Sequence, residues 1–505
     1  MQVLLNRGVP QILIPAEGTY PYIRGGVSTW IHDLIGGLEE FTFGVVFLGG
    51  RREDYGEVKY KFPENLVYLS TAYLFEERER PKPKYKEGES KTFELIRKMH
   101  EGFKKGITEV PEEVMTPDFL TKVLRYEDFL YSKRAWEHIV SMYSKHASTE
   151  PFVDYFWNIR NLHAPLWVVA EVASKVKAVD FKLIHSPSTG YAGFFASLLK
   201  RSTGRPFILT EHGIYTRERK IDLMNADWLT DKRTFVHKGL GEISATRKVW
   251  VNFFMHLGAL TYSSANIIVS LFDGARNIQI SYGADPQKCE VVPNGVDIEL
   301  YSNSLKNRPE KVPKVVALIG RVVQIKDVKT FIKAMKLLVE KLPEAEGWVV
   351  GPTDEDPDYY QECLSLVRVL GLEHKVKFLG FQKTFEIFPK IGVLTLTSIS
   401  EGMPLIVLEG FAAGVPCVAT DVGSCKQLIY GGLNEEDTAI GKAGEVVQVR
   451  NAQALAESYA NLLKDEALWK QYQKAALERV RRFYSKETFL ENYRGLYRRY
   501  LSWQA

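Results

Sequence analysis

Glu401 and Glu409 are the residues whose type and spacing most clearly indicate chemistry. The apolar run 393–397 before them predicts a buried strand, and residues 405–413 predict a short helix. Glu401 then lies in the strand-to-helix turn, and Glu409 lies one turn inside the helix. Carboxylates there can accept hydrogen bonds from hydroxyl groups while N–H groups at the helix start hold a phosphate. The pair suits a sugar nucleotide, although a glutamate near a helix start can also serve only to complement the helix dipole.

Two cations follow an earlier predicted strand. Residues 315–320 form an apolar run that ends at Arg321, and Lys326 precedes Asp327, which is placed to cap a helix. Two cations opposite a phosphate-binding helix start would neutralise a diphosphate without a metal ion. Lysine and arginine are weak indicators by themselves, because they usually lie on solvated surfaces.

Together with Pro293-Asn294-Gly295-Val296-Asp297, these residues form an ordered set that resembles glycosyltransferase family 4, the retaining, metal-independent transferases of GT-B fold. The resemblance implies that Arg321 and Lys326 hold the donor diphosphate. It also implies that Glu401 contacts the donor sugar at the reaction centre and that Glu409 binds the ribose hydroxyls. The full donor-binding set in this half of the chain is Asn294, Arg321, Lys326, Gly402, Met403, Leu405 and Glu409.

A motif in the first half of the chain narrows the resemblance to one group of glycosyltransferases. A predicted strand at 11–15 leads into Glu17-Gly-Thr-Tyr-Pro-Tyr-Ile-Arg-Gly-Gly-Val-Ser, which is similar to the cytosolic glycosyltransferases of Pel-type exopolysaccharide systems. Gly25 and Gly26 let the backbone approach a phosphate or sugar closely, or they form an ordinary tight turn. Ser28 or Thr29 is expected to cap the helix that follows.

His212 stands at the end of another predicted strand, 206–211. The resemblance implies that its imidazole lies over the donor sugar and helps to orient the anomeric carbon, which makes His212 and Glu401 the expected catalytic residues. The alternative is a histidine at the edge of the core whose ring is satisfied by the backbone. His185 has a weaker case and is left out of the predicted site.

Composition is typical of a large soluble enzyme. The chain has 505 residues, of which 45% are hydrophobic and 25% charged, and its net charge of +4 is too small to indicate nucleic-acid binding. No run is apolar enough for a signal peptide or a membrane helix, so we expect a cytoplasmic protein. The four cysteines lack metal-ligand spacing, and no metal or other cofactor is expected. Asp354-Glu-Asp356 precedes a predicted helix and is interpreted as its cap rather than as a metal site.

Two series of alternating strands and helices predict an α/β protein. We predict an N-terminal Rossmann-like domain at 1–300 with a helix-rich insertion at about 72–178, and a nucleotide-sugar-binding Rossmann-like domain at 301–467. The polar residues 298–313 are expected to link them. The resemblance implies GT-B architecture, in which the two domains face a central cleft and C-terminal helices at 468–505 cross back to the first.

Basic and aromatic residues alternate from Lys470 to Arg499. They indicate docking to the inner face of a membrane or to membrane-bound synthase subunits, or else a helix with a packed aromatic face and a solvated basic face. The predicted function is transfer of a hexose or N-acetylhexosamine from a UDP-sugar to a growing exopolysaccharide. The alternatives are a UDP-sugar epimerase of the same fold and a partner-dependent nucleotide-sugar-binding subunit of a membrane polysaccharide synthase.

Overall fold

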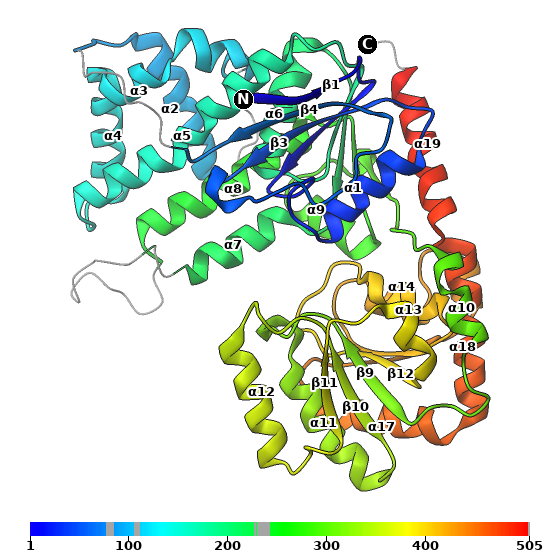
Figure 1. Cartoon of the computed structure of the whole chain (residues 1–505). Helices are drawn as coiled ribbons and strands as arrows, with labels where there is room; N and C mark the ends of the chain where they lie inside the picture. The colour runs from blue at the N-terminus through cyan, green and yellow to red at the C-terminus, as the bar shows by residue number, and fades with distance from the viewer. Residues whose placement is uncertain (77–84, 106–111, 227–228, 230–242, 503–505) are drawn as a thin grey trace. The chain divides into compact units, whose positions relative to one another are not determined.

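The computed structural model describes residues 1–76, 85–105, 112–226, 229 and 243–502. The chain divides into two compact units, each with its own sheet (Figure 1). The first unit comprises Met1–Ser270, Arg276–Glu290 and Arg494–Ala505, and the second comprises Leu271–Ala275 and Val291–Tyr493. The second unit therefore begins a few residues before the boundary predicted at residue 300.

The first unit contains an eight-stranded sheet in the order β1-β4-β3-β2-β5-β6-β7-β8. Strand β1 pairs antiparallel with β4, whereas β2, β3, β4, β5, β6 and β7 pair in parallel. Every residue of β3 is buried, as expected for a parallel strand covered on both faces. The strands are β1 Gln2–Asn6, β2 Ile12–Glu17, β3 Phe43–Gly49, β4 Leu66–Tyr73, β5 Leu183–Ser186, β6 Phe207–Glu211, β7 Ile267–Ser270 and β8 Cys289–Val291.

Helices cover this sheet, and those between β4 and β5 form the insertion predicted at about 72–178. Figure 1 shows α2 to α5 gathered beside the sheet of their own unit. The insertion helices are α2 Ser90–Lys105, α3 Tyr126–Tyr131, α4 Lys133–His146 and α5 Phe152–Val176. The other helices between its strands are α1 Gly26–Gly37, α6 Gly190–Thr203, α7 Tyr215–Asn225, α8 Ala245–Ser264 and α9 Asp273–Ser281.

The second unit is a parallel six-stranded sheet in the order β11-β10-β9-β12-β13-β14. The order reverses between β9 and β12, which makes this the switch point of a Rossmann-like sheet. The strands are β9 Val315–Ile319, β10 Glu346–Val350, β11 Val376–Gly380, β12 Val393–Leu396, β13 Cys417–Thr420 and β14 Gly444–Val447. The helices before the tail are α10 Ile298–Lys306, α11 Val328–Lys341, α12 Pro357–Val369, α13 Thr384–Ile387, α14 Leu405–Ala412, α15 Cys425–Tyr430, α16 Glu435–Ala439 and α17 Ala452–Lys464.

Two local predictions are wrong. The segment 298–313 is not simply a linker, because it contains α10, whose first turn is capped by the Asp297 carboxylate accepting from Leu300 N at 3.1 Å. Neither Ser28 nor Thr29 caps α1, because the helix already begins at Gly26 and Gly25 occupies the cap position without a side-chain bond. The apolar residues Trp30, Ile31, Leu34 and Ile35 of α1 are buried.

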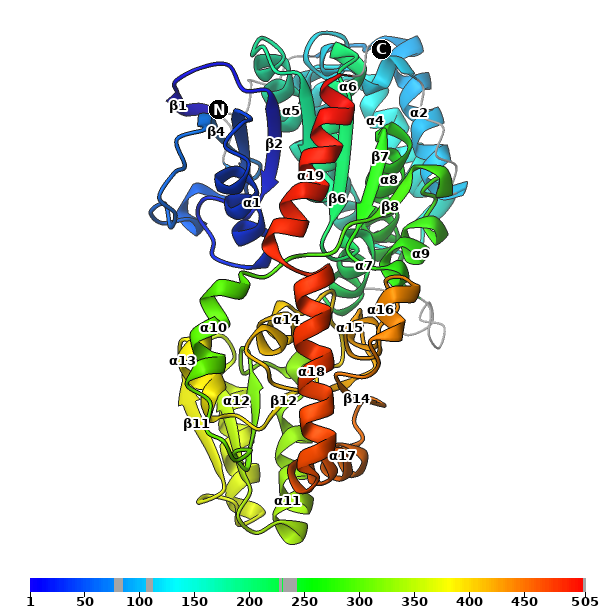
Figure 2. The same cartoon turned by 90° about the vertical axis from the view of Figure 1, so that its right-hand side faces the viewer.

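The tail forms two helices, α18 Glu466–Phe483 and α19 Lys486–Leu501. Helix α18 packs against α14 and α17 in the second unit (Figure 2). The end of α19 belongs to the first unit, where Arg494 pairs with Glu40 at 2.5 Å. Aromatic side chains along the tail are buried, so they pack inside the fold; they are Trp469, Tyr472, Tyr484, Phe489, Tyr493 and Tyr497. No helix within the described ranges is both long and apolar enough to cross a membrane.

Candidate functional site

The switch point of the second unit brings the predicted donor-binding residues to one edge of its sheet. Strands β9 and β12 are neighbours, and the loops that follow them carry Arg321, Lys326 and Glu401. In open α/β sheets, ligands bind outside the carboxyl ends of the strands at the switch point. The sheet topology therefore places these three side chains where a ligand is expected.

Lys326 and Glu401 form an ion pair in this edge. The Lys326 Nζ atom lies 2.5 Å from Glu401 Oε1, and the Ser398 hydroxyl donates to the same oxygen at 2.5 Å. Only 23% of the lysine side chain and 12% of the glutamate side chain are exposed, so solvent screens this pair weakly. Separate roles were predicted for Lys326 and Glu401, whereas in the structure their opposite charges pair directly.

The loops that carry this pair are held to each other. The Thr397 hydroxyl donates to the carbonyl oxygens of Lys326 and Asp327 at 2.8 and 3.0 Å, and Ile399 N donates to Ile325 O at 2.9 Å. Gly423 has φ +54°, and a Cβ atom built there would lie 2.3 Å from the Gly402 carbonyl oxygen. Only glycine fits at this approach, which fixes the turn that contains Glu401.

Arg321 lies at the exposed side of the same edge. Its Nη1 atom is 2.5 Å from Glu355 Oε1, and about half of each side chain is exposed, 53% and 51%. Exposed pairs of this kind contribute little free energy, so a phosphate can replace the carboxylate at low cost. The neighbouring Asp356 caps α12 by accepting from Tyr359 N at 3.2 Å, as predicted for this acidic segment. The role of Glu355 was missed because a sequence does not show which cation a loop carboxylate meets.

Helix α14 begins at this edge with Pro404 in its cap position. Across the described part of the chain, the N–H groups of Gly402, Met403 and Leu405 have no hydrogen-bond acceptor. The first N–H groups of a helix have no intrahelical acceptor and carry a partial positive charge. They are therefore free to bind an anion, as predicted for a diphosphate.

Glu409 is partly buried inside α14. The hydroxyl groups of Tyr301 and Thr384 hydrogen-bond to each other at 2.9 Å beside its carboxylate. Burial raises the pKa of the Glu409 carboxyl, while the two nearby hydroxyls oppose the rise. Tyr301 belongs to α10, inside the segment that was predicted to be a linker. The carboxylate therefore lies in a setting of hydroxyl groups, which is the chemistry that binding a ribose requires.

Asn294 and Gly295 belong to a close crossing of two backbone segments. Val296 N donates to Tyr484 O at 2.9 Å, and a Cβ atom at Gly295 would lie 2.4 Å from the Ser485 carbonyl oxygen. Gly295 is therefore required by packing alone. The Asn294 side chain is buried, and its amide oxygen has no hydrogen-bond partner among the described residues, which leaves it available to a ligand.

Gly25 and Gly26 follow β2 at the switch point of the first unit. No described atom lies within 4 Å of a Cβ atom built at either residue, and neither has the left-handed φ that favours glycine. Packing in the described structure therefore does not explain why both positions are glycine. Glycine at both positions leaves open space against the bare backbone.

His212 follows β6 in the first unit. Its ring packs edge-on against Trp30 with centroids 4.6 Å apart, and its buried Nε2 atom has no hydrogen-bond partner in the described chain. Burial lowers the pKa of His212 to about 3, so the imidazole is uncharged at neutral pH. By contrast, His185 is satisfied by Tyr497 and Thr210 at 2.7 and 2.8 Å, which agrees with leaving it out of the predicted site.

Two buried glutamates behind these residues were not assigned roles from the sequence. Glu17 accepts from Ala192 N at the start of α6 and from the Tyr215 hydroxyl, both at 3.0 Å, and burial raises its pKa. Glu211 accepts from Tyr262 and Gln279 at 2.7 and 3.0 Å, and burial raises its pKa to about 7. Both stand at the last position of a strand, the signal that could have identified them. Their hydrogen bonds tie these two strand ends to α6, α7, α8 and α9.

No group of three or more histidine, cysteine, aspartate or glutamate side chains in the described ranges is placed to hold a metal ion. The four cysteines are buried and free. Lys326, Arg321 and the N–H groups at the start of α14 are positive groups that this edge offers to an anion.

Comparison with known proteins supports this division of the chain. Residues 313–465 match the family model described as "Glycosyl transferases group 1". The D-inositol 3-phosphate glycosyltransferase of Corynebacterium glutamicum is 27% identical over 234 residues, which are 43% of this chain and 53% of that protein. The N-acetylgalactosaminyltransferase of Campylobacter jejuni that acts on a diphospho-undecaprenol is 26% identical over 231 residues, 45% of this chain and 58% of that protein. The chain spans about half the length of the curated relatives it matches.

Solved structures show that the fold is GT-B. The Anabaena protein Alr3699/HepE in complex with UDP matches with a TM-score of 0.59 at 15% identity, over 96% of this chain and 99% of that chain. Sucrose-phosphate synthase from Thermosynechococcus elongatus matches with a TM-score of 0.59 at 14% identity, over 97% and 98%. The family model described as "Domain of unknown function (DUF3492)" covers residues 10–287, more than half of the chain. The chain therefore belongs to the DUF3492 family and joins that domain to a glycosyl transferases group 1 domain in a GT-B fold.

Proposed function

We propose that this protein is a retaining, metal-independent glycosyltransferase that uses a UDP-sugar. The observation that carries the proposal is the edge of the second sheet, which offers two cations after β9 and, at the start of α14, three N–H groups without acceptors in the described chain. A nucleoside diphosphate has the charge and the oxygen atoms that this edge can bind. The match of residues 313–465 to a glycosyltransferase family supports the same conclusion.

The proposed reaction exchanges one bond at the anomeric carbon. The bond from this carbon to the diphosphate oxygen breaks, and the acceptor hydroxyl oxygen bonds to the carbon on the same face. The hydroxyl proton passes to an oxygen of the departing phosphate. Lys326, Arg321 and the α14 N–H groups stabilise the negative charge that develops on the UDP. Glu401 binds the sugar and stabilises positive charge near the reaction centre.

The remaining assignments rest on the family resemblance. His212 is assigned to the donor sugar, where an uncharged imidazole can hydrogen-bond a hydroxyl. The acceptor is proposed to be a growing exopolysaccharide of Pel type, and the donor a UDP-hexose or UDP-N-acetylhexosamine. Cytoplasmic placement beside membrane-bound synthase subunits is the setting in which such a polymer would be extended.

Binding of UDP tests the proposal directly. In titration calorimetry, UDP and at least one UDP-hexose should bind, while NAD and ADP should bind much more weakly. A radiolabelled UDP-hexose should then release UDP only when an acceptor is present, which separates transfer from epimerisation. Tight binding of NAD with no binding of UDP would overturn the proposed function.

Replacing each glutamate should give a different defect. Glu409→Ala removes the ribose-binding carboxylate, so UDP affinity should fall roughly tenfold to a hundredfold, the loss expected for hydrogen bonds to a charged group. Glu401→Ala should leave UDP affinity within about threefold of wild type but slow transfer by on the order of a hundredfold. Calorimetry and initial rates measure the two effects.

Tyr301→Phe is the matched control for Glu409→Ala. It removes a hydroxyl that lies beside the Glu409 carboxylate but keeps the carboxylate itself. Because ribose hydroxyls would take the place of this donor, UDP affinity should not fall in Tyr301→Phe. Loss of UDP binding in folded Glu401→Ala would show that the roles of the two glutamates are wrongly assigned.

A further inference from the structure

The insertion helices α4 and α5 and helix α8 of the first unit surround a cavity of about 380 Å³. This volume lies in the range of roughly 300–1,000 Å³ that is typical of sites for small molecules. Helices α4, α5 and α8 supply most of its wall, and the donor-binding edge lies in the other unit. The buried part of the lining consists of apolar and aromatic side chains, among them Ile139, Ala147, Tyr155, Ile159, Leu162 and Phe253.

Hydrogen bonds between the helices hold the cavity open. The Trp250 indole N–H on α8 donates to Asn158 Oδ1 on α5 at 2.9 Å. The Glu150 carboxylate, between α4 and α5, accepts from Thr246 N at the start of α8 at 3.2 Å. The Tyr143 hydroxyl donates to Glu150 O at 2.6 Å. The walls are therefore preformed, as in most ligand sites.

The inner part of the cavity contains an uncharged histidine. His163 is buried there, and its Nδ1 atom lies 2.7 Å from Ile159 O of its own helix. Burial lowers the pKa of His163 to about 4, so its ring is uncharged at neutral pH. A second cavity of about 40 Å³ shares four lining residues with the first, which are Phe129, His138, His163 and Phe253, so the apolar interior continues beyond it.

The rim has the opposite character. His146 and Lys248 line the cavity with exposed side chains, and Lys248 forms no ion pair with any described carboxylate. The nearby Glu150 carboxylate is occupied by the Thr246 N–H and hydroxyl groups. An apolar interior below a cationic rim is complementary to a molecule with a hydrocarbon chain and an anionic head.

We propose that this cavity binds a single-chain amphiphile, with its hydrocarbon chain inside and its anionic head beside Lys248. The chain would be buried among Ile159, Leu162 and Phe253, and the head would remain at the solvent-exposed rim. None of the lining residues belongs to the predicted donor site, so this proposal goes beyond the proposed glycosyl transfer.

Titration of the full-length protein with fatty acid anions below their micelle concentrations tests the proposal. Decanoate should bind with one-to-one stoichiometry. Octanoate should bind roughly tenfold more weakly, because each buried CH₂ group contributes about fourfold in affinity. Butyrate should show no saturable binding. Equal affinity for the three anions, or no saturable binding of decanoate, would overturn the proposal.

Two variants locate the site. Lys248→Glu reverses an exposed charge at the rim, so decanoate affinity should fall roughly tenfold while affinity for uncharged decanol stays within about threefold. Lys182→Glu is the matched control, because this exposed lysine does not line the cavity, and both affinities should be unchanged. Ala147→Phe fills the cavity and should abolish binding of both ligands. Unchanged decanoate affinity in Lys248→Glu, whose fold is not at risk, would refute the proposed site.

Sedimentation with phosphatidylglycerol vesicles shows whether the bound hydrocarbon chain comes from a membrane lipid or from a free amphiphile. Vesicle binding that is lost in Ala147→Phe supports insertion of an acyl chain from a membrane lipid. Decanoate binding without vesicle binding supports a free amphiphile. UDP affinity should be the same in wild type and in all three variants, so a failure here is distinguishable from a failure of the proposed glycosyltransferase function.

Discussion

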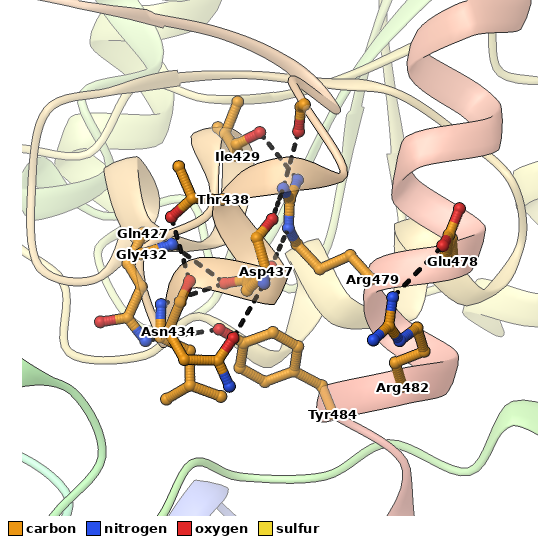
Figure 3. Close-up of polar contacts among 12 residues, drawn as sticks. Gln427, Ile429, Gly432, Asn434, Asp437, Thr438, Glu478, Arg479, Arg482 and Tyr484 are labelled. Atoms are coloured by element: carbon orange, nitrogen blue, oxygen red, sulfur yellow. Dashed lines mark hydrogen bonds and ion pairs between the residues drawn. The ribbon is translucent and has the colours of Figure 1, made fainter.

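Replacing Arg479 with methionine should lower the free energy of unfolding by about 3–5 kcal/mol, the cost of breaking a buried ion pair by removing one partner. Arg479 on α18 and Asp437 on α16 are both fully buried, with Nε and Oδ1 2.6 Å apart (Figure 3). Methionine has a similar length and no charge, so the variant would leave the Asp437 carboxylate without its cation. The tail helix is joined to the sheet domain through this pair.

Further bonds make the pair harder to replace. The Arg479 guanidinium also donates to Ile429 O at 3.0 Å and to Gly441 O at 2.7 Å. The second Asp437 oxygen accepts from the N–H groups of Gly432 and Leu433 at 3.0 and 3.1 Å. Removing the arginine therefore leaves buried carbonyl groups without a donor as well as an unpaired charge.

Urea unfolding followed by circular dichroism measures the loss, and Arg482→Met is the matched control. Arg482 is on the same helix and pairs with Glu436 at 2.5 Å, but 43% of its side chain is exposed. Its replacement should change the free energy of unfolding by less than about 1 kcal/mol. Arg479→Met with Asp437→Leu should be more stable than Arg479→Met alone, because no charge is then left buried. Equal losses in Arg479→Met and Arg482→Met would contradict the assignment.

The sheet of the second unit could be predicted because its strands are buried on both faces. Such strands are continuous apolar runs, for example β9 and β12, and the helices between them show a separate periodicity. The same reasoning placed Arg321 and Glu401 at strand ends, and hence on one edge. The apolar runs do not show the order of the strands in the sheet. The family resemblance, however, implied a Rossmann-like sheet.

Pairings between distant residues could not be predicted. The bonds Lys326 to Glu401 and Arg321 to Glu355 join segments that a sequence does not show to be adjacent. Helix α10 was taken for a linker because its polar residues conceal an amphipathic pattern. Strand β1 was not predicted. It is an edge strand whose side chains are mostly exposed, so its sequence lacks the pattern of a buried strand.

Removing the positive charge of Lys326 should weaken UDP binding roughly tenfold to a hundredfold, because a charge-assisted hydrogen bond contributes about 1.5–3 kcal/mol. Lys326→Met keeps the length of the side chain and tests only the charge. Uridine has no phosphate, so its affinity should be the same in wild type and in the variant. Titration calorimetry with both ligands separates loss of the diphosphate contact from misfolding.

The pairing of Lys326 with Glu401 predicts that the two positions are not additive. Lys326→Met alone leaves the Glu401 carboxylate unpaired beside the diphosphate, where it repels the ligand. Adding Glu401→Gln to Lys326→Met should therefore recover part of the lost UDP affinity, as expected for two residues in direct contact. Strictly additive losses would show that the ion pair does not persist when UDP binds.

Arg321 should behave differently, because its partner Glu355 competes with the ligand. Arg321→Ala removes all the hydrogen-bond donors of the guanidinium, whereas Arg321→Lys replaces them with a point charge. Arg321→Ala should therefore weaken UDP binding more than Arg321→Lys. Glu355→Gln should strengthen UDP binding slightly, because it frees the guanidinium without removing it. If these cations replace a metal, UDP affinity should be unchanged by EDTA and by added magnesium. Strict dependence on magnesium would instead require a metal beside the diphosphate, and the carboxylates of Asp354 and Glu355 would become its candidate ligands.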